Sequence, residues 1–434
     1  MRWMHGEESN EMRFLIVSYS CAPLNIISSQ RVNALAKYLV GCGHEVTILT
    51  SVKHPTDGPV DAITQWRELE SLVEVHEVEF LGRKRLQYAG DKKKSGTGSH
   101  GWMGPSLRGI LKKCRSIASI LLGALFDYRT VWALCAVAYY RRMLASRQFD
   151  IMVTSSGPAC VNYVGFRVSR ISKGLRWVAD FRDLWSLLHS SKVTALTRKA
   201  EMLIERRLLA GAARITTVSS HLCEQMQALH DIPVQVVRNG YDPVEFENLV
   251  ADRDFFPSRG CAELINIVYA GSIYEGGRDP SPLIAAVAAS DARRRIAIHF
   301  FGFNLGHVPA QIKSLGAGDF CHVHASKPRE EILSIQKAAD INLLLESGRE
   351  DARGVLTGKL FELAAIQRPV LSVGPPLHFE SMEILRRTGL HVHWETTGGD
   401  VDEVLARARE ASPVPDFIRT LSRESQFMRV PEFA

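Results

Sequence analysis

The fold of this chain is decided by its residues 13–50, RFLIVSYSCAPLNIISSQRVNALAKYLVGCGHEVTILT. The stretch opens with the apolar run FLIVS at residues 14–18 and closes with EVTILT at residues 45–50, and both runs are typical of buried strands. Between them, apolar residues recur at the spacing of one helix face, namely at Val32, Leu35, Ala36 and Leu39. The sequence therefore predicts a strand–helix–strand unit, and the first loop of such a unit commonly binds phosphate.

The same alternation of apolar strands and helical segments recurs on both sides of a polar stretch. The expected strands lie at residues 151–154, 177–180, 214–218 and 234–237 before it, and at residues 266–269, 296–301, 341–345 and 369–373 after it. Apolar runs that alternate with helices indicate parallel sheets with both faces covered. We therefore predict an α/β protein of two Rossmann-like, doubly wound domains, with the break at residues 240–263.

The N-terminal domain is expected to span residues 12–245 and the C-terminal domain residues 260–410, with a tail at 411–434 that packs back on the first domain. Two insertions interrupt the first domain. Residues 83–115 form a basic loop with ten Lys or Arg against one acid, which either meets an anionic surface or is simply solvated. Residues 117–144 hold apolar runs too short to span a bilayer as helices, so they either pack on the domain or lie at a membrane interface.

The composition is that of a soluble globular protein, since 46% of the 434 residues are hydrophobic, 23% are charged and the net charge is +6. The eight cysteines include no CxxC pair, which favours reduced core thiols over disulfides or a metal site. The first eleven residues lack the apolar core of a signal peptide. We expect a cytoplasmic protein, peripheral at the inner face of the plasma membrane. Nucleic acid is not an expected partner, because no reading module accompanies the basic loop.

The strongest candidate for a ligand site is the stretch at residues 354–369, GVLTGKLFELAAIQRP. Thr357 is placed to cap a helix that Gly358 and Lys359 open, and the N–H groups at such an end suit a phosphate. A bound anion would offset the unfavourable position of Lys359 at the positive end of the helix dipole. The alternative is that Lys359 and Glu362 form an i, i+3 ion pair on a solvated face.

This stretch resembles the donor-site helix of retaining GT-B glycosyltransferases of family four, in the branch written K-L-F-E-Y-L-A-x-x-x-P, with Leu363 in place of the tyrosine. The resemblance implies that Glu362 binds the ribose of a nucleotide-sugar donor. Many members carry a second glutamate, which contacts the donor sugar, at the position of Gly354. The resemblance therefore leaves the identity of the sugar open.

Residues 269–280, YAGSIYEGGRDP, resemble the strand and loop that hold the pyrophosphate in this family. Gly271 is the glycine of that loop, Ser272 replaces the usual arginine, and Arg278 matches the second basic residue. Negative charge builds on the leaving diphosphate as the glycosidic bond breaks. The resemblance therefore implies that Arg278 and Lys359 stabilise that charge.

In the N-terminal half, residues 179–186, ADFRDLWS, match the motif A-D-F-R-D-P-W-S of the same branch. Residues 13–50 resemble its opening unit, without the usual pair of glycines in the first loop. Arg182 and Asp183 are the candidates for the catalytic face, because they end a strand where α/β proteins bind ligands. For Asp180 the alternative is a structural ion pair with Arg182.

The resemblance implies a glycosyltransferase that moves a sugar from a nucleotide-sugar, held between the two domains, to an acceptor hydroxyl with retention of configuration. The expected acceptor is a glycan or lipid-linked glycan in cell-surface polysaccharide or glycolipid assembly. No cofactor and no metal are expected, since no DxD-type motif ends a strand. Two alternatives stay open: a nucleotide-sugar epimerase on the same fold, and a degenerate, non-catalytic GT-B assembly subunit. A dinucleotide oxidoreductase is disfavoured, because no G-x-G-x-x-G follows a strand.

Overall fold

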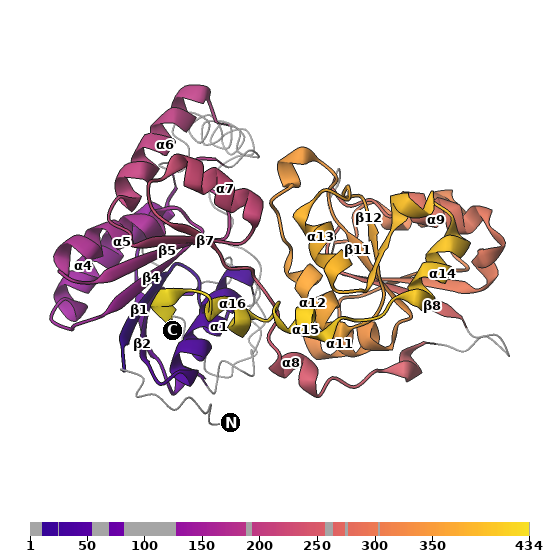
Figure 1. The fold of residues 1–434 in the computed structure, drawn as a ribbon, viewed down its shortest axis with the longest axis horizontal. Helices are drawn as coiled ribbons and strands as arrows, with labels where there is room; N and C mark the ends of the chain where they lie inside the picture. The colour runs from indigo at the N-terminus through magenta and orange to yellow at the C-terminus, as the bar shows by residue number, and fades with distance from the viewer. Residues whose placement is uncertain are drawn as a thin grey trace, which may run out of the picture. The chain divides into compact units, whose positions relative to one another are not determined.

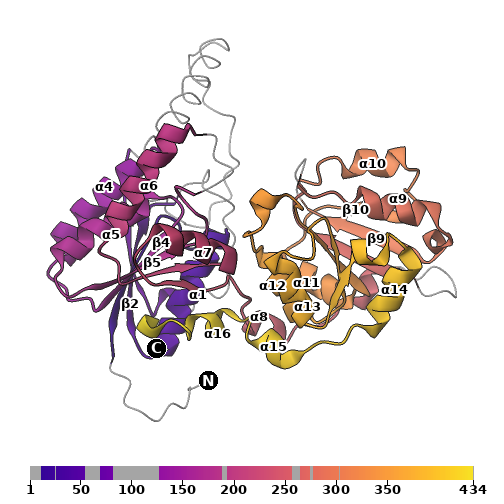
Figure 2. The same cartoon turned by 45° about the horizontal axis from the view of Figure 1, so that its top comes forward.

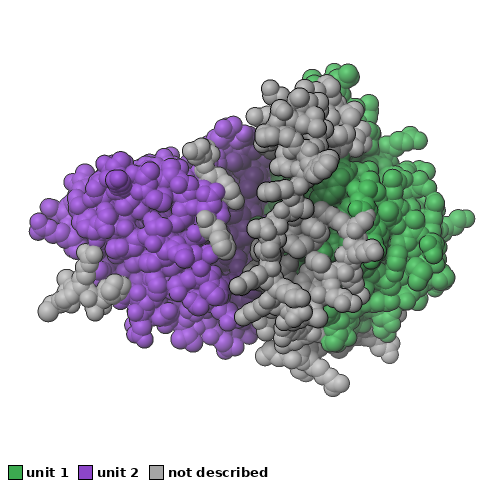
Figure 3. All heavy atoms as spheres, turned by 180° about the vertical axis from the view of Figure 1, so that it is seen from behind, with its two compact units in different colours: residues 1–218, 222–237, 427–434 green, residues 219–221, 238–426 purple. Residues whose placement is uncertain are grey.

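The computed structural model describes residues 11–24, 26–53, 69–81, 127–187, 193–256, 264–273, 277–302 and 304–433. The chain divides into two compact units, which Figure 3 colours separately. Unit 1 comprises residues 1–218, 222–237 and 427–434, and unit 2 comprises residues 219–221 and 238–426. The predicted basic loop at 83–115 and the apolar run at 117–126 lie outside the described residues.

Unit 1 is built on a parallel sheet whose described strands run in the order β3-β2-β1-β4-β5-β6-β7. The strands are β1 (Arg13–Ser18), β2 (Glu45–Ser51), β3 (Glu74–Val78), β4 (Ile151–Ser156), β5 (Arg176–Phe181), β6 (Arg214–Thr217) and β7 (Val234–Val236). The order reverses between β1 and β4, as in doubly wound folds. The sequence did not predict β3, because its residues EVHEV are mostly polar.

Helices cover both faces of this sheet, as Figures 1 and 2 show. One face carries α1 (Ile27–Gly41), and the other carries α4 (Arg129–Tyr139), its π-helical continuation η3 (Tyr140–Leu144), α5 (Cys160–Ile171), α6 (Ala195–Leu209) and α7 (Ser220–Leu229). Successive residues of a strand point to opposite faces. Accordingly, Phe14 belongs to the core cluster under α1, whereas Leu15 belongs to the cluster under α4 and α5.

The apolar run predicted at residues 131–140 forms α4 and packs on the domain. Its buried side chains are Trp132, Ala133, Ala136 and Val137. One side of this helix therefore packs on the domain. Among the described residues, no helix is both long enough and apolar enough to cross a membrane.

Unit 2 is built on a second parallel sheet, in the order β10-β9-β8-β11-β12-β13 over its described strands. The strands are β8 (Ile265–Ala270), β9 (Ile296–Phe301), β10 (Cys321–His324), β11 (Ile341–Leu345), β12 (Val370–Val373) and β13 (His391–His393). The order reverses between β8 and β11. Two doubly wound parallel sheets confirm the predicted α/β fold class.

The helices of unit 2 also lie on both faces of their sheet. One face packs under α9 (Ser281–Ala289), α10 (Val308–Ser314) and α14 (Val401–Glu410), and the other under α11 (Arg329–Ala338), α12 (Gly358–Ile366) and α13 (Glu380–Arg387). Shorter helices follow at the ends of the unit, namely α8 (Val244–Glu247), α15 (Pro415–Arg419) and α16 (Arg423–Phe427). Covering both faces leaves the carboxyl edge of the sheet as the place where loops gather.

The last residues of the chain complete the core of unit 1. Phe427, Val430 and Phe433 are buried in the cluster beneath α1. The Phe433 ring lies 6.4 Å from the Phe14 ring, and the Arg31 guanidinium lies 6.0 Å from the centre of the Phe427 ring. The terminal segment is therefore a structural part of unit 1.

We expect Phe427→Ala to lower the free energy of unfolding of unit 1 by about 3–5 kcal/mol, because it removes a large buried ring from a packed core. The neighbouring change Met428→Ala is the matched control, since Met428 is 54% exposed. Urea denaturation followed by tryptophan fluorescence measures both. Equal effects of the two substitutions would contradict a structural role for the terminal segment.

Candidate active site

The carboxyl edge of the unit 2 sheet collects polar groups at the reversal of strand order. The loop after β8 and the loop after β11 leave neighbouring central strands at this edge. In open α/β sheets this is the position where ligands bind. The stretches containing Gly271, Arg278 and Lys359, which the sequence singled out, all lie there.

Lys359 reaches from the first turn of α12 across the end of β8. Its ammonium lies 3.2 Å from the hydroxyl of Tyr269 and 4.7 Å from the centre of that ring. Gly271 adopts a φ of +140°, and a side chain there would overlap the end of Lys359. A glycine is therefore required beside the lysine, both for the backbone conformation and for the space.

Arg278 converges on the same place. Its Nη1 donates to the backbone oxygen of Ser272 at 2.8 Å, and the Tyr269 hydroxyl donates to that same oxygen at 2.9 Å. Burial, together with the charge of Arg278, lowers the pKa of Lys359 to about 8, although Glu362 and Glu346 act in the opposite direction. Two cations held this close favour a bound anion, which would lower their mutual repulsion.

The start of α12 is open to such an anion. Thr357 occupies the N-cap position, as predicted, but its side chain does not cap the helix. Its hydroxyl instead donates to Glu346 Oε1 at 2.7 Å. A side chain built at Gly358 would meet no atom within 4 Å. The N–H groups of the first turn carry the positive end of the helix dipole, and the N-cap side chain does not bond them.

Glu346 is a site residue that the sequence reasoning missed. It follows β11 directly, and only 8% of its surface is exposed. Burial raises the pKa of its carboxyl group, while hydrogen bonds from Thr357 and Ser381 and the charges of Arg278 and Lys359 oppose that rise. Its position at a strand end was the available signal, but a single glutamate after an apolar run is too common to be specific.

Glu362 lies one turn further along α12 and is paired, but not with Lys359. Arg329 of α11 places Nη1 2.9 Å from Glu362 Oε1. The same guanidinium contacts Glu245 of α8 through Nη2 at 2.7 Å and Nε at 3.2 Å. The i, i+3 pair considered from the sequence is therefore not formed. Arg329 was missed because it is far from Glu362 in the chain.

A hollow of about 450 Å³ adjoins the Gly271 loop. The residues that line it are Gly302, Asn304, Leu305, Gly306, Pro309, Val323, His324 and Ala325. Backbone hydrogen bonds join the two loops, since Gly271 N donates to Phe301 O at 2.8 Å and Ile273 N donates to Asn304 O at 2.7 Å. The volume is within the usual range of small-ligand pockets.

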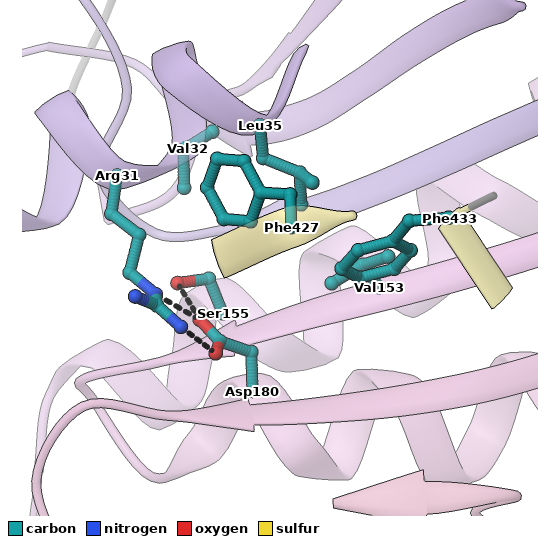
Figure 4. A pocket seen from close by; sticks show the side chains of 8 residues that line it. All are labelled: Arg31, Val32, Leu35, Val153, Ser155, Asp180, Phe427 and Phe433. Atoms are coloured by element: carbon teal, nitrogen blue, oxygen red, sulfur yellow. Dashed lines mark hydrogen bonds and ion pairs between the residues drawn. The ribbon is translucent and has the colours of Figure 1, made fainter. Parts of the chain in front are cut away.

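In unit 1, Asp180 of β5 is an internal anchor. It accepts hydrogen bonds from Arg31 Nε at 2.9 Å and Arg31 Nη2 at 2.7 Å (Figure 4). It also accepts one from Thr216 Oγ1 at 2.7 Å. Burial disfavours the charged carboxylate, but Arg31 and Thr216 together hold the pKa of Asp180 below its usual value. The ion pair between Asp180 and Arg182 that was considered from the sequence is therefore wrong, because Asp180 pairs with Arg31.

Arg182, at the carboxyl end of β5, bonds the end of the neighbouring strand. Its Nη2 donates to the backbone oxygen of Ser156 at 3.1 Å. Gly157 has a φ of +116°, and a side chain there would overlap the guanidinium. The buried Nε has no hydrogen-bond partner among the described residues, and burial lowers the pKa of Arg182. Asp183, the next residue, is exposed.

The segment after Asp183 is held in place by α6. Ser186 N donates to Glu205 Oε2 at 2.9 Å, and Arg198 Nη1 donates to Ser186 O at 3.1 Å. The other Glu205 oxygen lies 3.1 Å from His230 Nε2. These contacts fix the backbone that presents Arg182 and Asp183.

Of the residues that the sequence nominated, unit 2 brings together Gly271, Ser272, Arg278, Thr357, Gly358 and Lys359, with Glu362 one helical turn away. Arg182 and Asp183 belong to unit 1. The structure thus places two cations, Lys359 and Arg278, at the carboxyl edge of the unit 2 sheet. In unit 1 it places the consecutive residues Arg182 and Asp183 at the end of β5.

Comparison with known proteins agrees with this geometry. Residues 28–240 match the family described as glycosyl transferase 4-like domain. No curated protein matches the chain. Among solved structures, the chain is similar to sucrose-phosphate synthase from Thermosynechococcus elongatus, at 11% identity, 96% coverage of both chains and a TM-score of 0.59.

Two further structures are similar to this chain over nearly its whole length. A glycosyltransferase from Rickettsia africae has 14% identity, 96% coverage of both chains and a TM-score of 0.56. The lipopolysaccharide outer core galactosyltransferase WaaB has 12% identity, coverage of 96% of this chain and 98% of its own, and a TM-score of 0.55. Identities this low establish the fold alone. Together, the family match and the fold show that residues 28–240 are a glycosyl transferase 4-like domain and that the chain is a glycosyltransferase with the GT-B fold.

Proposed function

We propose that this enzyme transfers a sugar from a nucleotide-sugar to a hydroxyl group of a glycan or lipid-linked glycan, with retention of configuration, in cell-surface polysaccharide or glycolipid assembly. The observation that carries the proposal is the convergence of Lys359 and Arg278 beside the uncapped start of α12. A diphosphate is the anion that a nucleotide-sugar brings to such a place. The family in which residues 28–240 fall uses nucleotide-sugar donors.

Within the donor, each part has a chemically matched partner. The diphosphate takes the ammonium of Lys359, the guanidinium of Arg278 and the backbone N–H groups of Gly358 and Gly271–Ser272. As the glycosidic bond breaks, charge grows on the leaving phosphate oxygen, and fixed cations in a partly buried site stabilise it strongly. Glu362 accepts hydrogen bonds from the ribose hydroxyls, while the hollow next to the Gly271 loop suits the base by its size.

Glu362 can bind ribose only if one carboxylate oxygen remains available. Arg329 contacts Oε1. A carboxylate has about four acceptor positions on its two oxygens. Arg329 therefore orients the Glu362 carboxylate, and the remaining positions accept the two hydroxyl protons of a ribose.

Unit 1 supplies the acceptor side in this proposal. Asp183 is exposed at the end of β5, where it orients an acceptor or sugar hydroxyl. Arg182 beside it offers a buried Nε that has no hydrogen-bond partner among the described residues. We place the enzyme in the cytoplasm, peripheral to the inner face of the plasma membrane, where lipid-linked acceptors are available.

The donor site is tested by thermal denaturation in the presence of UDP-, GDP-, dTDP- and ADP-sugars. A ligand at a hundred times its dissociation constant stabilises a protein by about 2.7 kcal/mol, so the matching donor raises the melting temperature by several degrees. We expect Glu362→Gln to abolish this increase. Glu245→Gln is the matched control, because Glu245 pairs with the same Arg329 from α8 and lies outside the proposed site.

If no nucleotide-sugar shifts the melting temperature, or if both variants lose the shift equally, the proposed donor site is wrong and a non-catalytic subunit becomes the better interpretation. Product analysis then separates the remaining alternative. An epimerase converts the donor without any acceptor, whereas a transferase leaves the donor sugar unchanged until an acceptor is added.

The affinity for the nucleoside diphosphate should depend on pH through Lys359. In the free protein the pKa of Lys359 is about 8, and a bound diphosphate raises it because the anion favours the charged form. The contribution is therefore complete below pH 8 and is lost as the pH rises. Calorimetry should find binding roughly tenfold weaker at pH 9 than at pH 7.

The variant Lys359→Met provides the comparison for this pH dependence. It keeps an unbranched side chain of similar length but has no proton to lose. We expect its affinity to be low at pH 7 and to change little by pH 9. An unchanged wild-type affinity across this range would exclude Lys359 from the diphosphate site.

A further inference from the structure

Helix α6 buries its two glutamates and Leu209 but exposes two of its leucines, Leu196 and Leu203. Leu196 is 78% exposed and Leu203 is 68% exposed, whereas Glu201 is 3% exposed and Glu205 is not exposed at all. The hydrophobic effect alone would rotate such a helix the other way. Two sets of hydrogen bonds instead hold the helix in the observed orientation.

The first set caps the N-terminus of α6, where Thr194 Oγ1 accepts a hydrogen bond from Thr197 N. The second set involves the buried Glu205, which accepts from Ser186 N and contacts His230. Removing the partners of Glu205 would leave a buried carboxylate unsatisfied, at a cost of several kcal/mol. These contacts explain why Glu205 lies inward, whereas no contact given for the described residues explains the exposure of Leu196 and Leu203.

The outward face of α6 combines leucines with cations. At about 100° per residue, its exposed residues fall within an arc of about 140°. They are Ala195, Leu196, Lys199, Ala200, Leu203, Arg206 and Arg207. Arg206 lies near the margin of this arc, 3.9 Å from Asp231. The result is a strip, about 18 Å long, of apolar side chains flanked by positive charge.

The neighbouring helices continue this surface. α4 and α5 lie beside α6 on the same face of the unit 1 sheet, as Figures 1 and 2 show. Every exposed charged side chain on α4, η3 and α5 is a cation, namely Arg141, Arg142 and Arg170. Leu134 and Met143 add exposed apolar surface, at 53% and 54% exposure. We call the outward residues of α4, η3, α5 and α6 the helical face.

We infer that the helical face docks on an anionic lipid bilayer, with Leu196 and Leu203 inserted among the acyl chains and the flanking Lys and Arg on the lipid phosphates. A helix with a narrow apolar strip and a basic border is the kind that lies in a membrane interface. Long basic side chains reach the phosphates while their stems cover apolar surface. Nucleic acid would use the cations but would leave the leucines in water, so charge and apolarity together favour lipid.

This inference needs neither the donor nor the acceptor to be known, and it differs from membrane contact through the loop at 83–115. One consequence does rest on the proposed function. The inner face of α6 holds Ser186, which follows Arg182 and Asp183 by a few residues. A bilayer bound to the outer face would therefore lie on the helix that fixes the proposed acceptor residues.

The test is sedimentation of the full chain with vesicles of phosphatidylcholine alone or of equal parts phosphatidylcholine and phosphatidylglycerol. We expect the double variant Leu196→Gln, Leu203→Gln to weaken partitioning into the anionic vesicles at least tenfold, because two inserted leucines are lost. We expect Lys199→Gln with Arg207→Gln to weaken it roughly 25-fold, at about fivefold for each cation. The wild type should bind the neutral vesicles far less.

A double variant in unit 2, Val250→Gln with Leu377→Gln, is the control, since these residues are also exposed, at 77% and 51%. It should bind like the wild type. All variants should keep the wild-type melting temperature and the donor-induced shift, which separates loss of docking from loss of folding or of the proposed donor site.

Three results would overturn the inference. They are sedimentation of the wild type with neither vesicle, binding of the leucine and cation variants as tight as that of the control, and equal binding to neutral and anionic vesicles. If the same variants instead lost binding to a nucleic acid or a protein partner while vesicle binding stayed intact, the helical face would be assigned to that partner.

Discussion

Both sheets of this protein reverse their strand order beside their first strand, and this constraint decides where chemistry can gather. In a parallel sheet every connection crosses one face, so all carboxyl ends open at the same edge. Where neighbouring connections leave toward opposite faces, the edge between them is not covered. In unit 2 this place lies between β8 and β11, and it receives Lys359, Arg278 and the start of α12.

The buried carboxylates of the two units serve as anchors. Asp180 holds Arg31, Glu205 holds the backbone at Ser186, and Glu346 takes the hydroxyl of Thr357. A buried carboxylate without such partners would cost several kcal/mol, which is why each of them accepts hydrogen bonds. The Glu346 contact has a second effect. Because Thr357 donates to Glu346, it does not cap α12, and the positive end of that helix stays open to an anion.

The cations of the donor edge behave differently from these anchored acids. Lys359 and Arg278 lie against the same Tyr269–Ser272 corner, and burial together with the charge of Arg278 lowers the pKa of the lysine. Repulsion between two such cations is typical of functional sites, where a bound ligand of opposite charge relieves it. In the function proposed above, the leaving diphosphate carries growing negative charge, so the repulsion between these two cations would be relieved as the reaction proceeds.

Helix α6 connects the proposed acceptor residues with the proposed lipid-binding face of unit 1. Its inner Glu205 fixes the segment after Arg182 and Asp183, and its outer face exposes Leu196 and Leu203 beside cations. The hydrogen bonds that position the segment therefore also keep these two leucines at the surface.

The sequence by itself determined the two series of strands, the doubly wound class and the loops on which the donor residues lie, because apolar runs and glycine-rich turns are local signals. It missed β3, β10 and β13, whose short sequences EVHEV, CHVH and HVH are too polar to be recognised as strands.

Only the tertiary structure decided the partners of the charged residues. Asp180 pairs with Arg31 instead of Arg182, Glu362 with Arg329 instead of Lys359, and Thr357 bonds Glu346 instead of its own helix. In each case the sequence offered a nearby partner, and the fold brought a distant one closer. A charge interacts with whatever lies within a few ångströms, and distance in space between residues far apart in the chain is set by packing of the whole unit.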